Sequence, residues 1–275
     1  MPSPKDVIGL AGCGAMGLPM ARNLRRAGFD VWGFDVRPLD EFGDFSERMV
    51  PDPQDFAARC SIVISVVRDL AQTEDLLFDS QAILNNAPPI ELLVISSTLS
   101  PRHLVPLRRR VPETIAMVDA PMSGAPFAAE DATLSFMLGG DQKDLERLQP
   151  MLDAMGRVCH PMGAFGAGMT AKVLNNFVAA SSIVAVRKVL DWAAELGVEP
   201  EKLLTLMHDS SGQTWFGSNI DRIDWWDEAY DPENTIGILE KDVSCELDGA
   251  AVDSNDPFGA AVKAALKGMP PPKPQ

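Results

Sequence analysis

The feature that most constrains the fold is a glycine-rich segment near the amino terminus. Residues Val7–Ala11 form a short apolar run that predicts a β-strand. The run continues into Gly12-Cys13-Gly14-Ala15-Met16-Gly17, and an amphipathic helical stretch, Met16–Ala27, follows. In such a strand–loop–helix, the first glycine permits the tight turn, the second admits a pyrophosphate, and the third packs against the strand. These six residues therefore predict a dinucleotide-binding loop, whose amides at the helix N-terminus hold phosphates.

An acidic residue follows this loop at a spacing typical of such sites. Asp35 lies 18 residues after Gly17, at the end of the predicted strand Asp30–Phe34. A carboxylate in this place accepts hydrogen bonds from the ribose hydroxyls and repels a 2′-phosphate, which favours NAD. Arg37 lies two residues further on. Since an arginine there can accommodate the 2′-phosphate, NADP stays open as the second choice.

Further strands alternate with helical patterns up to about residue 163. The apolar runs are Ile62–Val67, Leu92–Ser96, Ile115–Ala120 and Leu134–Leu138, and a helix is expected at Asp141–Met155. Such alternation predicts βαβ units and a parallel sheet. The runs are apolar without interruption, as expected for strands that helices cover on both faces.

The strand signal disappears after Gly163. One long helix is expected at Ala167–Leu196, followed by helices at Glu199–Asp209 and Ile236–Val252. The predicted fold class is therefore α/β: a Rossmann-type doubly wound parallel sheet domain, followed by an all-α C-terminal domain. The expected boundaries are 1–163 for the dinucleotide-binding domain, 164–268 for the all-α substrate and dimerisation domain, and 269–275 for a proline-rich tail.

Charge and composition exclude several functions. The chain has 24 Lys and Arg against 39 Asp and Glu, a formal charge of −15, so neither nucleic acid nor an anionic membrane surface is an expected partner. Four scattered cysteines form no CxxC pair and three histidines share no HxxxH spacing, so no metal site is expected. The most apolar long stretch, Val173–Leu190, contains asparagine, arginine and lysine, and the amino terminus is unlike a signal peptide. A cytoplasmic protein is expected.

Three segments are candidates for the substrate side of a site. Ser123 and Gly124 follow the strand Ile115–Ala120, where a hydroxyl and an amide can bind a carboxylate, although a plain loop of small residues reads equally well. Lys172 and Asn176 are four residues apart and share a helix face. Lys241 precedes Asp242 on a later helix, either as a ligand contact or as a solvated charge pair.

Lys172 suits proton transfer. Its apolar neighbours and its place near a helix N-terminus both disfavour the charged amine, and oxidation of a hydroxyl requires a group that accepts its proton. The alternative from the residues alone is a surface lysine whose stem covers apolar side chains.

Taken in order, these segments resemble the β-hydroxyacid dehydrogenase family, typified by 3-hydroxyisobutyrate dehydrogenase. The similarity extends over about residues 6–250 and includes the glycine-rich opening, Ser97-Thr98, DAPMSGAP at 119–126, GAGMTAKVLNN at 166–176, SSGQTW at 210–215 and EKDV at 240–243. The chain departs from the family pattern at Ala125 and Ala132, where glycines are usual, at Ile95, where an acid is common, and at Val67-Arg68 in place of Leu-Pro.

The resemblance implies roles for single residues. Lys172 would be the general acid and base, Asn176 would position the substrate, and Thr98 would contact the nicotinamide end. Ser123 and Gly124 would hold the substrate carboxylate, and Lys241 would reach both cofactor and substrate.

The implied reaction is reversible hydride transfer between NAD, or NADP, and a short 3-hydroxy acid or the corresponding semialdehyde. An imine reductase of the same fold is one alternative, but those enzymes generally lack the lysine. A non-catalytic dinucleotide-binding module is another, and it should have lost the lysine or the serine. Members of the family form dimers or tetramers, and the helix Val173–Leu190 has apolar residues on more than one face, so a homodimer or homotetramer is expected.

Overall fold

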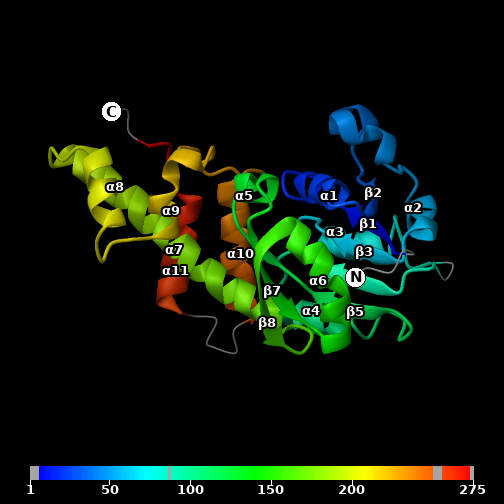
Figure 1. Cartoon of the computed structure of the whole chain (residues 1–275). Coiled ribbons are helices and arrows are strands. Elements are labelled where there is room, and N and C mark those ends of the chain that lie inside the picture. Colours follow the sequence, from blue (N-terminus) through cyan, green and yellow to red (C-terminus); the bar gives the residue numbers. More distant parts are fainter. Residues whose placement is uncertain (1–5, 86–87, 250–255, 273–275) are drawn as a thin grey trace. The chain divides into compact units, whose positions relative to one another are not determined.

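The structure, a computed structural model, describes residues 6–85, 88–249 and 256–272. The chain divides into two compact units, Met1–Lys172 and Val173–Gln275 (Figure 1). Helix α7 (Ala167–Glu195) begins in the first unit and continues in the second.

The first unit is built on one eight-stranded sheet in the order β2-β1-β3-β4-β5-β7-β6, with β8 paired to β7. Its strands are β1 (Val7–Ala11), β2 (Asp30–Phe34), β3 (Ile62–Ser65), β4 (Leu92–Ile95), β5 (Ala116–Asp119), β6 (Met122–Ser123), β7 (Leu134–Gly139) and β8 (Gly156–Gly163). Its helices are α1 (Gly17–Arg26), η1 (Leu39–Arg48), α2 (Pro53–Arg59), α3 (Leu70–Leu77), α4 (Pro101–Leu107), α5 (Pro126–Glu130) and α6 (Gln142–Met155).

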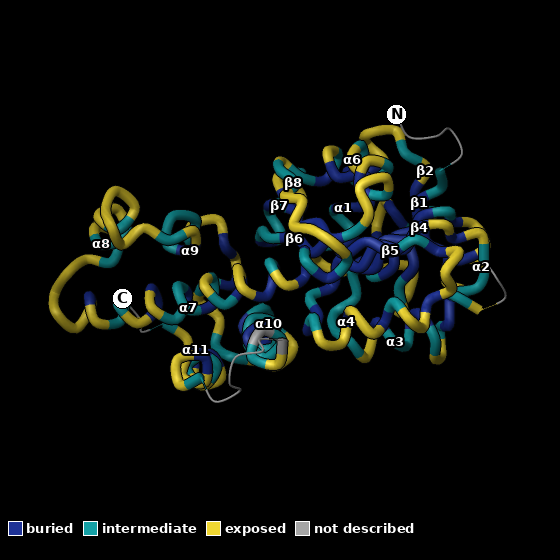
Figure 2. Tube along the Cα trace, turned by 90° about the horizontal axis from the view of Figure 1, so that it is seen from below, coloured by how far each residue is buried: buried dark blue, intermediate teal, exposed yellow. Residues whose placement is uncertain are grey.

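Helices cover both faces of this sheet, which confirms the doubly wound fold. Alternate residues of the central strands belong to two different apolar clusters, as the two-residue period of a strand requires. Buried residues of α1 and α6 join the cluster of Leu10 and Ile64, whereas those of α2, α3 and α4 join the cluster of Val63 and Leu93. Figure 2 shows the resulting buried strands inside a more exposed shell of helices and loops.

The direction of the chain across the sheet reverses between β1 and β3. From β1 the chain moves to β2 on one side, and then crosses to β3 on the other side of β1. Strands β2, β1, β3, β4 and β5 are parallel, so their carboxyl ends lie at one edge. Ligands of doubly wound sheets bind at this edge beside the reversal point. The loop after β1, with Gly12 at its start, is therefore at the position where a dinucleotide is expected.

The prediction of a parallel sheet is correct for β1 to β5 and wrong beyond them. Strand β7 is antiparallel to both β5 and β6, and β8 returns parallel to β7. β6 and β8 were not predicted. β6 has only two residues, and most of β8 is exposed at the sheet edge and includes Pro161, so it lacks the apolar run of a buried strand.

Among the described residues of the second unit, the secondary-structure elements are all helices, joined by loops. After α7 come α8 (Pro200–His208), α9 (Trp215–Ser218), η2 (Ile220–Arg222), α10 (Thr235–Gly249) and α11 (Pro257–Lys267). The predicted helix Ile236–Val252 corresponds to α10, and its last residues lie outside the described ones. Helix α11 was not predicted; Asp256 caps it by accepting a hydrogen bond from the Gly259 amide, and Pro257 is its first residue.

Helix α7 is, among the described residues, the helix long and apolar enough to span a bilayer by length and composition. The same test is met by core helices of soluble proteins, and α7 carries two buried polar groups near its start, Lys172 and Asn176, and a buried Arg187 further along.

Candidate active site

The glycine-rich loop has the geometry of a phosphate-binding turn. Gly12 has φ +91°, in the left-handed region that favours glycine, and its amide donates to the Phe34 carbonyl at 2.9 Å. A Cβ on Gly14 would meet no atom within 4 Å, whereas a Cβ on Gly17 would overlap the Gly12 carbonyl oxygen. No side chain caps the first turn of α1, which begins at Gly17. The loop is thus open at its second glycine and closed at its third, as a bound pyrophosphate requires.

Asp35 lies against this loop. Its carboxylate accepts a hydrogen bond from the Cys13 amide at 2.8 Å and is 10% exposed. The Arg37 guanidinium pairs with the same carboxylate at 3.1 Å, donates to the Cys13 carbonyl at 2.8 Å, and lies 4.9 Å over the Phe42 ring. The loop, the acid and the arginine therefore form one connected cluster.

Cys13 contributes its backbone to that cluster. Its thiol is buried and its Sγ donates weakly to the Leu10 carbonyl. Burial, and next the nearby Asp35 carboxylate, raise the pKa of Cys13 to about 12, so the thiol stays neutral and is not a nucleophile.

Two buried hydroxyls lie at the carboxyl ends of neighbouring parallel strands, at the sheet edge where a dinucleotide is expected. Ser65 ends β3 and Ser97 comes two residues after β4, and the hydroxyl of neither has a hydrogen-bond partner within the described residues. Unpaired buried hydroxyls are costly, so a polar ligand at this edge is expected to satisfy them. Thr98, predicted to contact the nicotinamide, is next to Ser97 and partly exposed. The open loop, Asp35 and these hydroxyls fit a nicotinamide dinucleotide.

The predicted carboxylate-binding pair follows β5. Ser123 is in β6, opposite Ser135 of β7, and Gly124 has φ +142°. A Cβ on Gly124 would lie 2.8 Å from the Ala128 methyl, so α5 packs directly on this residue. Close by in sequence, Ala132 has φ +54°, an unfavourable conformation for alanine that explains why glycine is usual here.

Helix α7 carries the predicted proton-transfer pair. Lys172 and Asn176 are 8% and 7% exposed, so both point inward rather than to solvent. They are one helical turn apart and share a face of α7.

Within the second unit, Asn176 and Lys241 are joined by one carboxylate. Asp242, itself buried, accepts from the Asn176 side-chain amide at 2.6 Å and pairs with the Lys241 amine at 2.8 Å. Sequence reasoning placed Asp242 beside Lys241 but missed its bond to Asn176, because the two residues are 66 positions apart. This carboxylate fixes which way the Asn176 amide faces.

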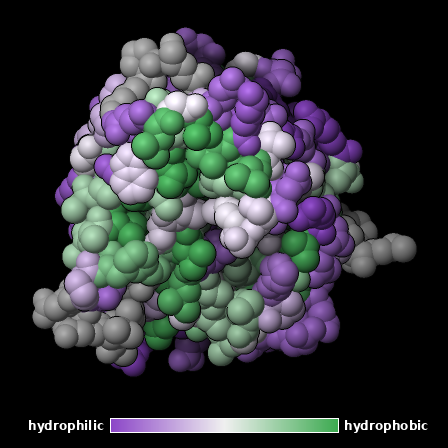
Figure 3. All heavy atoms as spheres, turned by 90° about the vertical axis from the view of Figure 1, so that its left-hand side faces the viewer, coloured by the Kyte–Doolittle hydropathy of each residue, from purple (hydrophilic) through white to green (hydrophobic). Residues whose placement is uncertain are grey.

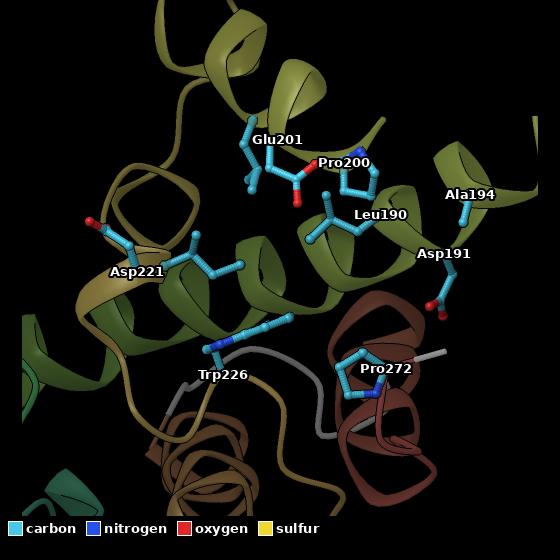
Figure 4. Close-up of a pocket in the computed structure, with 10 residues that line it drawn as sticks. Leu190, Asp191, Ala194, Pro200, Glu201, Asp221, Trp226 and Pro272 are labelled. Atoms are coloured by element: carbon cyan, nitrogen blue, oxygen red, sulfur yellow. The ribbon is translucent and has the colours of Figure 1, made fainter. Parts of the chain in front are cut away.

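The second unit also contains a pocket of about 320 Å³ between α7, α8 and the η2 segment (Figure 4). Most of its lining is apolar and includes Leu190, Trp226 and Pro272, and its charged groups are the acids Asp191, Glu201 and Asp221. A pocket with acids and no basic group in its lining repels a carboxylate. It is therefore unsuited to the carboxylate of a hydroxy acid.

Comparison with known proteins agrees with this geometry. Residues 7–163 match the sequence profile of the NAD binding domain of 6-phosphogluconate dehydrogenase, and residues 166–269 match that of the NAD-binding domain of NADP-dependent 3-hydroxyisobutyrate dehydrogenase. The chain is 32% identical to L-threonate dehydrogenase of Cupriavidus necator over 88% of this chain and 83% of that protein. It is also 32% identical to human mitochondrial 3-hydroxyisobutyrate dehydrogenase over 77% of this chain and 64% of that one.

A solved structure is similar over nearly the whole chain. It is 3-hydroxyisobutyrate dehydrogenase of Mycobacterium tuberculosis with L-serine, at 26% identity and a TM-score of 0.75, covering 95% of this chain and 92% of that one. Together with the dinucleotide loop and the helical second unit, these similarities show that the chain belongs to the β-hydroxyacid dehydrogenase family of NAD(P)-binding oxidoreductases.

Proposed function

We propose that the protein transfers hydride reversibly between NAD and a short 3-hydroxy acid, or reduces the corresponding semialdehyde. The observation that carries this proposal is the buried Lys172 one turn before the buried Asn176, in a chain whose first unit has the dinucleotide loop. The relatives named above act on hydroxy acids, which supports the substrate class.

In this mechanism the nicotinamide of the bound dinucleotide supplies the hydride acceptor. The Lys172 amine accepts the proton of the substrate hydroxyl during oxidation and returns it during reduction. The Asn176 amide, held by Asp242, positions the same hydroxyl. The Ser123 hydroxyl and the Gly124 amide bind the substrate carboxylate, whose charge the Lys241 amine complements.

The cofactor is held by the first unit. Gly12, Gly14 and Gly17 shape the loop, and the backbone of Cys13, Ala15 and Met16 lies along the pyrophosphate. Asp35 accepts from the adenosine ribose, and Thr98 contacts the nicotinamide end.

The proposed function is tested by steady-state turnover over a panel of short 2- and 3-hydroxy acids and semialdehydes with NAD and NADP. An imine reductase would instead turn over cyclic imines, and a non-catalytic module would bind NAD without turnover.

We expect a higher kcat/KM with NAD than with NADP, because the Asp35 carboxylate repels a 2′-phosphate and also neutralises Arg37. Asp35→Ser removes that repulsion and releases Arg37, so the ratio of the two kcat/KM values should move toward NADP by about tenfold, or roughly 1.4 kcal/mol. Asp30→Ser, at the opposite end of β2, is the matched control and should leave the ratio unchanged. A wild-type preference for NADP of about tenfold or more would mean that Arg37 decides the cofactor.

We also propose a homodimer or homotetramer. Large apolar side chains of the second unit are strongly exposed in a single chain, among them Val178, Trp192, Leu196, Leu206 and Phe258. Figure 3 shows apolar side chains gathered on one face of the molecule. Exposed apolar surface on this scale is typical of subunit interfaces. Light scattering at micromolar concentration should give at least twice the 29.7 kDa chain mass. A monomer mass that persists at higher concentration contradicts the proposal.

A further inference from the structure

Asp119 is a buried charged residue that the mechanism above does not use. It is the last residue of β5, and its side chain has no exposed surface. One carboxylate oxygen accepts from the Gly166 amide and the other from the Met169 amide, both at 2.6 Å. Gly166 immediately precedes α7, and Met169 is in its first turn. Because the first N–H groups of a helix have no partner inside the helix, Asp119 satisfies this terminus from a different element.

The start of α7 packs closely around this carboxylate. Gly139 of β7 is paired with Asp119, and a Cβ there would overlap the Asp119 carboxylate. A Cβ on Gly168 would lie 2.9 Å from the same carboxylate and 2.5 Å from the Met137 carbonyl oxygen. The start of α7 is thus in direct contact with the ends of β5 and β7. The two hydrogen bonds from the Gly166 and Met169 amides to Asp119 fix its position and rotation.

This arrangement carries a cost. Burial raises the pKa of Asp119 to about 6, although hydrogen bonds from the amides of Gly166 and Met169 lower it. The carboxylate is therefore ionised at neutral pH in a site that disfavours its charge. The positive end of the α7 dipole and the two amides offset part of that cost. A carboxylate can accept from both N–H groups at once, which a neutral amide side chain cannot, so the charged residue holds the two amides at the start of α7 together.

The position of Lys172 depends on this terminus, because Lys172 follows Met169 by three residues, less than one turn of α7. The direction in which its side chain leaves the helix is set by where the first turn lies and how it is rotated. We propose that Asp119 is a positioning residue that holds the start of α7 so that the Lys172 amine meets the substrate hydroxyl. This inference rests on the proposed function of Lys172 as the acid and base.

The test is Asp119→Asn, which keeps the shape but places an amide donor against one of the two backbone N–H donors. We expect kcat to fall by about 10- to 100-fold, as for a catalytic group displaced by up to an ångström, while the Kd for NAD stays within about twofold. The matched control is Asp52→Asn, since Asp52 also accepts from two amides, those of Gln54 and Asp55, at the start of α2. Turnover of that control should equal the wild type.

A second pair of variants separates positioning from general loosening of the fold. In the Lys172→Ala background, Asp119→Asn should lower the residual turnover by less than about twofold, because no amine remains to be positioned. If instead the residual turnover falls by the same factor as in the wild type, Asp119 acts independently of Lys172 and the inference is wrong. Unchanged turnover for Asp119→Asn alone overturns it equally.

Failure of the underlying proposal has a different signature. If Lys172→Ala itself turns over at the wild-type rate, the role of Lys172 is wrong, and the inference falls with it. Should Asp119→Asn not fold, Gly168→Ala takes its place. It keeps the carboxylate but pushes the start of α7 away from β5 and β7, and it should give the same loss of kcat with an unchanged Kd for NAD, again only when Lys172 is present.

Discussion

Lys172→Ala lowers kcat by about 10²- to 10⁴-fold, the range typical of a lost general acid or base, while the Kd for NAD changes little. The Kd for NAD changes little because Lys172 is buried on α7, whereas the glycine loop and Asp35 are held by a hydrogen bond between Cys13 and Asp35 that does not involve it. Lys172→Arg should be nearly as damaging, because a guanidinium does not release its proton near neutral pH. The measurement is steady-state turnover beside a fluorescence titration of the cofactor.

The control for this prediction is Lys188→Ala, on the same helix but exposed, which should keep wild-type turnover. A small primary amine added to Lys172→Ala should restore part of the lost rate, since it can enter the space that the lysine occupied. If Lys172→Ala stays within a few-fold of the wild type, the lysine is structural and another group accepts the proton.

Arg187→Met destabilises the second unit by on the order of 3 kcal/mol, because several hydrogen bonds to a charged donor are lost and the acceptors stay in place. The buried guanidinium of Arg187 donates to the carbonyls of Trp226 at 2.5 Å, Glu228 at 3.2 Å and Pro270 at 2.7 Å. It thereby ties α7 to the segment before α10 and to the chain after α11. Methionine keeps the length and apolar stem but donates nothing.

Urea unfolding followed by tryptophan fluorescence measures this change, because four of the five tryptophans are in the second unit. Lys188→Met, next to Arg187 but exposed, is the control and should shift the midpoint by far less. An Arg187→Met midpoint equal to that of the control would show that water replaces the three bonds at no cost.

Local sequence patterns were enough to predict the central elements of the first unit. The strands at Val7–Ala11 and Asp30–Phe34 have the predicted bounds. Val7–Ala11 is a central strand with an uninterrupted apolar run, as a buried parallel strand requires, whereas Asp30–Phe34 is the edge strand and starts with an exposed Asp30. The glycine loop was equally predictable, since its backbone conformation depends on residues that are adjacent in the chain. The resemblance to a known family then supplied the candidate roles, and the roles of single residues and the domain boundary at 163 stay predictions.

Strands that depend on a neighbouring strand were harder to predict from the sequence. Strand β8 is mostly exposed and has no apolar period of its own, and it exists because β7 offers it an edge. The antiparallel direction of β7 relative to β5 could not be predicted either, because an apolar run such as Leu134–Leu138 has the same pattern in a parallel and in an antiparallel strand.

The finest features of the candidate site were decided by tertiary structure alone. The sequence by itself determined that Lys172 and Asn176 share a helix face, because helix geometry relates residues four apart. It did not determine that Asp242 holds Asn176, that Arg37 donates to the Cys13 carbonyl of the glycine loop, or that Asp119 caps α7. Each of these contacts joins residues whose side chains meet only after distant segments have packed. The burial that makes such contacts strong is itself a product of that packing, so no local pattern encodes them.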